Sequence, residues 1–176
     1  MEVGNALNSL LALFFGVILV IFPIFVAIFY SREKNYELIK KGDRDFMARY
    51  GSIIDGLNFK RRLRWALFYP CLSMCRKLWL AYILVYQKDK PVLCIFCVIV
   101  QALLMIAVAG TVEPMTAVSK NRMQLFNELF VVLISYHLIP LTEFMTDFEI
   151  RNNLVGKSLI VVTLFNLAVN ILLALF

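Results

Sequence analysis

The chain has 176 residues, 61% of them hydrophobic, and a mean hydropathy of +0.79. A soluble domain of this length cannot bury so much apolar surface, so a soluble globular protein is excluded. The formal net charge is +6, from 18 Lys and Arg against 12 Asp and Glu. Because no soluble module is present to carry a basic face, we expect no nucleic-acid partner. The lipid bilayer and its anionic headgroups are the expected counter-charge.

Five hydrophobic runs are long enough to cross a membrane as helices. A helix that rises about 1.5 Å per residue needs roughly 20 apolar residues to cross a hydrocarbon core about 30 Å thick. The sequence therefore predicts an all-α fold, a polytopic membrane helix bundle of about five transmembrane helices. The runs are Ser9–Tyr30, Trp65–Tyr86, Val92–Ala109, Leu125–Phe144 and Val155–Phe176.

The first run is expected to be a retained span rather than a cleaved signal peptide. Its flank, residues 1–5, lacks basic residues, and the run is longer than a signal-peptide core. Pro23 lies inside it and removes one backbone hydrogen bond, so a kink is expected there. The predicted organisation is a first transmembrane helix over 1–30, a basic linker over 31–64 and a four-helix transmembrane bundle over 65–176.

The linker carries ten of the 18 basic residues, which places it on the cytoplasmic or equivalent side of the membrane. Its alternating charges predict a basic amphipathic helix along the membrane surface, broken near Gly51 and Gly56. The turn at 87–91 and the loop at 145–153 then lie on the opposite side. Four basic residues near the end of the linker are candidate contacts to lipid headgroups: Lys60, Arg61, Arg62 and Arg64.

The second run has two interpretations, because Arg76 lies at its middle and Pro70 in its first half. In one, Trp65–Tyr86 is a single span. In the other, Leu57–Tyr69 is an interfacial helix and Cys71–Tyr86 is a short or tilted span.

The four cysteines are expected to be reduced packing residues rather than metal ligands. If the second and third runs form a hairpin, Cys94 lies opposite position 83 and Cys75 opposite position 102. Cys75 and Cys97 then differ by roughly 7 Å in height, too far apart for a shared tetrahedral site. No metal or cofactor is therefore predicted. The sequence also lacks a phosphate-binding loop, a zinc helix and a nucleophile elbow, so we expect no enzyme.

Polar side chains form a layer near the middle of the predicted spans. Ionisable groups at that depth are costly and mark ion or proton paths, whereas amides and hydroxyls commonly join helices for about 0.6 kcal/mol each. We expect the joining role for Gln101, Ser135, Asn166 and Asn170. Arg76 is expected to pair with another member of the layer or to extend toward the basic side. The candidate layer is Arg76, Gln101, Glu128, His137 and Asn166.

Several short motifs occur in a fixed order and resemble the C-terminal transmembrane regions of large, Cys-rich surface proteins of ciliates. They also resemble, more remotely, the membrane modules of transient-receptor-potential-like and polycystin-like proteins. The resemblance covers Tyr50 to Asn170. The motifs are Tyr50–Leu57, Arg76-Lys77 before an aromatic-rich helix, Leu125–Glu128 followed by Tyr136–Leu138, and Arg151 ahead of Gly156–Ile160, Asn166 and Asn170.

The resemblance implies an integral protein of the plasma or ciliary membrane, while the mitochondrial inner membrane stays open. Members of that family carry a long Cys-rich region before these helices and commonly a tail after them, so a fragment or a small protein with the same module is expected. Channel-like relatives imply cation permeation, yet Asp147 and Glu149 are the only acidic residues of the 145–153 loop. We favour a structural or accessory subunit of a larger membrane assembly over an ion channel or transport module.

Overall fold

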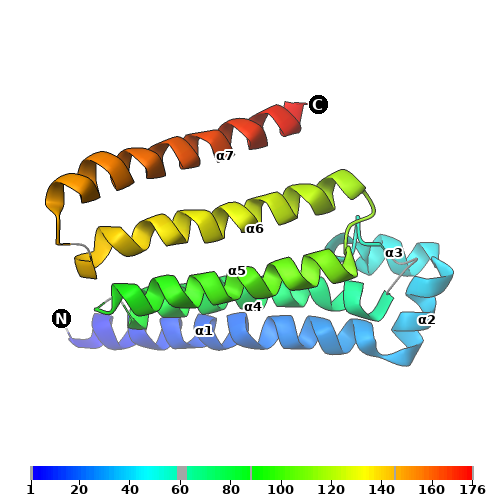
Figure 1. Ribbon diagram of the computed structural model, residues 1–176. Helices are drawn as coiled ribbons and strands as arrows, with labels where there is room; N and C mark the ends of the chain where they lie inside the picture. The colour runs from blue at the N-terminus through cyan, green and yellow to red at the C-terminus, as the bar shows by residue number, and fades with distance from the viewer. Residues whose placement is uncertain (1, 59–62, 88, 145, 176) are drawn as a thin grey trace. The chain divides into compact units, whose positions relative to one another are not determined.

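The computed structural model describes residues 2–58, 63–87, 89–144 and 146–175, and this described part is helical with no strand (Figure 1). The chain divides into two compact units, Met1–Trp79 and Leu80–Phe176, and each is described by itself. The helices are α1 (Glu2–Ser31), α2 (Glu33–Lys41), α3 (Arg44–Tyr50), η1 (Gly51–Ile53), α4 (Leu63–Tyr86), α5 (Pro91–Val112), α6 (Val118–Ile139), η2 (Pro140–Phe144), η3 (Ile150–Gly156) and α7 (Lys157–Leu175).

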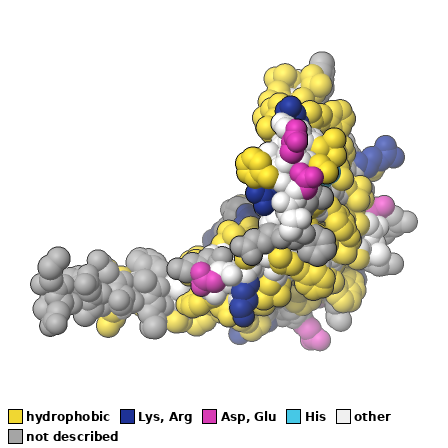
Figure 2. Space-filling view, turned by 60° about the vertical axis from the view of Figure 1, so that its left-hand side comes forward, with side chains coloured by type: hydrophobic (Ala, Val, Ile, Leu, Met, Phe, Trp, Pro, Cys, Tyr) yellow, Lys and Arg dark blue, Asp and Glu magenta, His cyan; other side chains and the backbone are white. Residues whose placement is uncertain are grey.

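Three helical segments are long and apolar enough to cross a membrane: Pro91–Val112, Val118–Thr142 and Ile150–Leu173. A fourth is added if Gly16–Ser31 and Glu33–Lys41, which are bent by 68°, form one broken span. Figure 2 shows hydrophobic side chains over most of the described surface in view, with charged side chains as scattered spots. The prediction of an all-helical integral membrane protein is thereby confirmed. The number of five spans is not, because α4 is not among the described helices that qualify.

In the first unit, the linker folds into two short helices rather than one. α2 ends at Gly42, whose φ of +68° is the left-handed conformation that glycine adopts at little cost. Its N–H donates to the carbonyl of Ile39 at 3.1 Å. Asp43 then begins α3, where its Oδ1 accepts the N–H of Phe46 at 2.8 Å. The linker therefore breaks first at Gly42, ahead of the predicted break at Gly51.

Aromatic side chains hold α3 against the end of α1. The ring of Phe29 is stacked on that of Phe46, with centroids 6.2 Å apart, and lies 5.2 Å from that of Tyr50. The hydroxyl of Tyr30 donates to the backbone carbonyl of Tyr50. The side-chain amide of Asn35 donates to the carbonyl of Phe29 at 2.8 Å, which fixes the start of α2 as well. The end of α1 and the linker therefore form one packed cluster.

α4 runs without interruption from Leu63 through Pro70 to Tyr86, and α1 likewise runs through Pro23. A proline removes only one hydrogen bond, which a long helix tolerates. Leu57 lies outside any helix, so an interfacial helix over Leu57–Tyr69 that is separate from the following span is not what the structure shows. Of the candidate headgroup contacts, Lys60, Arg61 and Arg62 lie outside the described residues. Arg64 lies in the first turn of α4, and its side chain is outside the described part.

In the second unit, the turn between α4 and α5 brings Cys94 against the end of α4. Its thiol lies 3.0 Å from the carbonyl of Gln87 and 3.9 Å from that of Ile83. Cys94 therefore lies beside the turn between Ile83 and Gln87, within about one helical turn of the position 83 that the hairpin register predicts. Among the described residues, no group of three or more His, Cys, Asp or Glu is placed to hold a metal ion.

α5 and α6 form an antiparallel pair (Figure 1). The buried residues of α5 recur every three or four positions, so they form one face, and two of them, Ala102 and Ala109, are completely buried. Small side chains of this kind let two helix backbones approach closely in a membrane. The buried residues of α6 are polar and lie seven positions apart, on a single stripe: Asn121, Glu128 and Ser135.

α6, and the helical segment that leads into α7, begin earlier than the hydrophobic runs predict. α6 starts at Val118, because its polar first turns still form a helix, and the helical segment before α7 starts within the predicted loop. There the Oδ1 of Asp147 accepts the N–H groups of Glu149 at 3.0 Å and Ile150 at 3.1 Å, which satisfies the free donors of a helix start. The segment η3 has the wider π-helical winding.

Candidate functional site

The main polar cluster of the second unit is made of three asparagines between α6 and α7. The side-chain amides of Asn127 and Asn170 bond each other reciprocally, with N···O distances of 3.0 and 2.8 Å. The amide nitrogen of Asn170 also lies 2.9 Å from the backbone carbonyl of Asn166 and contacts its side-chain oxygen. In hydrocarbon, such groups have no water to bond, so this cluster favours the helix pair over separated helices.

A second polar contact joins the same helices nearer the turn. The Nε2 of His137 lies 2.8 Å from the hydroxyl oxygen of Ser158, and its Nδ1 lies 2.8 Å from the carbonyl oxygen of Leu133. A carbonyl only accepts, so Nδ1 carries the hydrogen, and in a neutral ring Nε2 accepts the hydrogen of the Ser158 hydroxyl. The group that orients the imidazole is thus a backbone carbonyl of its own helix rather than a carboxylate.

Between these polar contacts, the ring of Phe130 stacks on that of Phe165 with centroids 5.8 Å apart. The contacted positions advance along α6 from Asn127 through Phe130 to His137. Their partners run the opposite way along α7, from Asn170 through Phe165 to Ser158, over a nearly equal number of residues. All three contacts therefore belong to one antiparallel register. Polar groups at both ends fix it, since a shift of one residue would leave the amides and the imidazole without these partners.

The structure places the five residues of the predicted polar layer in different surroundings. His137 on α6 contacts Ser158 on α7, Asn166 contacts Asn170 within α7, and Gln101 is half-buried on α5. Glu128 is only 6% exposed on the buried stripe of α6. Arg76 is half-buried on α4 and belongs to the first unit, whereas the other four belong to the second. Asn170 bonds Asn127 on α6, as the joining role predicts, whereas the bonds of Asn166 described above are to Asn170 on its own helix.

Two partners in these contacts were not anticipated. Asn127 lies one residue before Glu128, near the start of the predicted fourth span, and Ser158 lies near the start of the fifth. If the fourth and fifth runs form a hairpin, counting inward from Phe144 and Val155 puts Asn127 opposite position 172 and His137 opposite position 162. The observed partners, Asn170 and Ser158, lie within about one helical turn of these positions.

The turn between α5 and α6 is held by one side chain. The Oδ1 of Asn121 accepts the N–H of Met115 at 2.9 Å, and its Nδ2 donates to the carbonyl of Met115 at 2.9 Å. Asn121 is 7% exposed, and the neighbouring Pro114 is fully buried. Glu113 has a φ of +47°, a conformation that costs a non-glycine residue roughly 1–2 kcal/mol. The two bonds of Asn121 help to maintain this strained turn.

A groove of about 310 Å³ lies between α6 and the start of α7, beside the contact of His137 and Ser158. It is open along one side, and its lining is almost entirely apolar. The lining residues are Tyr136, His137, Pro140, Leu154, Val155 and Ser158.

No protein-family model, curated protein or solved structure matches the chain.

Proposed function

We propose that the protein is a non-enzymatic integral membrane protein that serves as a structural or accessory subunit of a larger membrane assembly. The observation that carries this proposal is the division of α7 into two faces. Its polar side chains Ser158, Asn166 and Asn170 bond to α6 or to one another. The most apolar part of Ile150–Leu173 nevertheless has no buried residue in the described structure. The side of α7 turned away from α6 is therefore apolar. In the proposed assembly, a helix of a partner subunit packs on part of this face.

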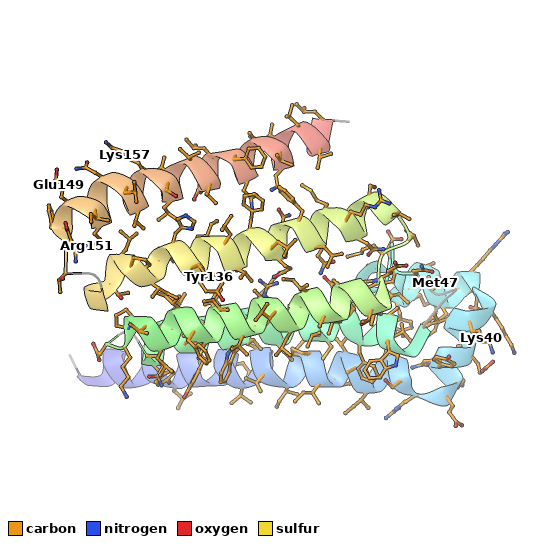
Figure 3. The ribbon with its side chains drawn as sticks, in the orientation of Figure 1. Lys40, Met47, Tyr136, Glu149, Arg151 and Lys157 are labelled. Atoms are coloured by element: carbon orange, nitrogen blue, oxygen red, sulfur yellow. The ribbon has the colours of Figure 1, made fainter. Side chains whose placement is uncertain are left out.

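The same proposal includes five spans, with α4 as the second, and a bilayer contact through the linker. Six basic residues of α2, α3 and the residue before α2 are exposed, which supports contact with anionic headgroups on the positive-inside face. Lys40 extends away from the ribbon in Figure 3. The six are Arg32, Lys34, Lys40, Lys41, Arg44 and Arg49. The plasma or ciliary membrane is the proposed location, with the mitochondrial inner membrane as the second choice.

Cysteine labelling tests this topology. In a version with the four native cysteines replaced by Ser or Ala, a single Cys at Lys40 should react with an impermeant maleimide from the cytoplasmic side only. A Cys at Lys90 should react from the opposite side only, because α4 separates the two positions. Both positions are exposed, so local burial does not limit either reaction. Labelling of both from the same side would contradict α4 as a span.

Photo-crosslinking along α7 tests the subunit role. A photoreactive amino acid at Ile160, Leu164 or Ile171, each at least 52% exposed, should capture the same unlike protein in native membranes. These positions recur at helical spacing, so one partner helix lying along α7 would contact all three. The matched control is Phe130, whose ring faces Phe165 on α7 and should give crosslinks within the chain.

Ion conduction is the second candidate function, and the buried carboxyl group of Glu128 favours it. Ionisable residues within membrane segments are rare, and they commonly mark ion or proton paths. The crosslinking experiment separates the two functions. If crosslinks form only between copies of this chain, the copies should form a symmetric ring. Ion conduction by that ring in liposomes would then favour the channel over the subunit role.

A further inference from the structure

The groove lies between α6 and the segment formed by η3 and the start of α7. All six of its lining residues lie in Val118–Thr142 or in Ile150–Leu173, and both segments qualify as spans. Its volume of about 310 Å³ is at the lower end of the range of small-molecule sites, roughly 300–1,000 Å³. Tyr136 and Leu154 at its edge are 57% and 70% exposed, so the groove is accessible from the side. An apolar chain fits this lining better than a polar ligand does.

A positive charge stands at the end of this groove near the turn. Arg151 precedes Leu154 and Val155 by three and four residues, so it lies about one turn before them, toward the start of η3. In Figure 3, Arg151 lies on the side of η3 that faces α6, whereas Lys157 points away from α6. The guanidinium carbon of Arg151 lies 5.4 Å from the centre of the Phe148 ring. This contact restrains the side chain of Arg151 at the start of η3.

We propose that this groove binds one phospholipid of the bilayer, with an acyl chain between α6 and α7 and the phosphate on Arg151. Along this segment, the charge of Arg151 comes first and the apolar lining follows. A phospholipid has the same order, with its phosphate first and its acyl chains after it. A planar guanidinium also bonds phosphate with two parallel N–H donors, which a lysine does not do. The proposal is independent of the subunit role, and it concerns the opposite end of α6 from the turn held by Asn121.

The neighbouring carboxylates leave room for this role of Arg151. The Oδ1 of Asp147 already accepts two backbone N–H groups. Glu149 points away from α6 in Figure 3. A phosphate at Arg151 therefore meets the guanidinium first.

Native mass spectrometry of the full chain tests the proposal. The purified protein is stripped of lipid, titrated with dioleoyl phosphatidylglycerol in detergent, and scored for one retained lipid per chain. Arg151→Gln should weaken retention about tenfold, the change that corresponds to about 1.4 kcal/mol. Lys157→Gln, which removes a charge six residues away on the other side, should leave retention unchanged. Dioleoylglycerol, which has the same chains but no phosphate, should bind wild type as weakly as the phospholipid binds Arg151→Gln.

A second variant covers the case in which Arg151→Gln fails to fold. Val155→Phe fills the groove and keeps the guanidinium, so it should also lose the retained phospholipid while the thermal unfolding midpoint stays near wild type. Equal loss in Arg151→Gln and Lys157→Gln, or no loss in Val155→Phe, would show ordinary annular lipid and overturn the site. Displacement of the lipid by inorganic phosphate would also overturn it, since the acyl chain would then contribute nothing.

Discussion

Asn121→Ala should destabilise the protein by about 2–3 kcal/mol, the largest effect we expect from any single polar substitution outside the linker. The variant loses both bonds to the backbone of Met115, and each leaves a partly buried donor or acceptor unsatisfied. The loss falls on a turn that already contains the strained Glu113. Unfolding of the purified chain by SDS in detergent, followed by circular dichroism, measures the change.

Asn121→Asp separates the two bonds. An ionised carboxylate still accepts the N–H of Met115 but cannot donate to its carbonyl, so the expected loss is intermediate, with an added cost for a buried charge. Lys120→Ala, an exposed change at the neighbouring position, should alter stability by less than about 0.5 kcal/mol. Equal stability of Asn121→Ala and the Lys120 control would show that the turn is held by packing alone.

Asn170→Leu should cost about 1–2 kcal/mol and more than Asn127→Leu. The amide of Asn170 bonds both Asn127 on α6 and Asn166 on its own helix. Its removal therefore strands Asn127, whereas the removal of Asn127 leaves Asn170 with its contacts to Asn166. The same SDS unfolding measurement ranks the two variants.

The double variant Asn127→Leu/Asn170→Leu completes a cycle. Because both partners become apolar, it should be more stable than Asn170→Leu, and the interaction energy should be clearly different from zero. Thr163→Val is the matched control, since the Thr163 hydroxyl is exposed and bonds only the carbonyl of Leu159 on its own helix. Strict additivity of the two asparagine changes would contradict a direct bond between them.

These two sets of variants also bear on the proposed roles. If the asparagines join α6 to α7, Asn170→Leu changes only the packing of α7 on α6. Crosslinking of a partner protein to the outer face of α7 should then fall only as much as α7 loses its contact with α6. The phospholipid site lies beside His137, about ten residues along α6 from Asn127. Stability effects at the asparagines and lipid retention at Arg151 should therefore be separable.

The sequence by itself determined that the protein is helical and lies in a membrane, because span length and apolar content follow from bilayer thickness. It also placed Cys94 to within about one helical turn of its contacts with Ile83 and Gln87, since depth in a hairpin of two helices follows from counting residues. The helix ends were less certain. Polar turns such as those at the start of α6 extend beyond the hydrocarbon without ending the helix, so hydropathy does not mark them.

Only the tertiary structure decided which polar groups meet. Residues at one depth share a level but not a direction, and rotation about the helix axis turns Asn127 toward α7 while Glu128, the next residue, lies on the buried stripe with Asn121 and Ser135. Likewise, the break at Gly42 and the clamp of Asn121 on Met115 depend on backbone angles and on contacts that composition does not encode. Depth is a one-dimensional property of a sequence, whereas the pairing of side chains also depends on how each helix is rotated against its neighbours.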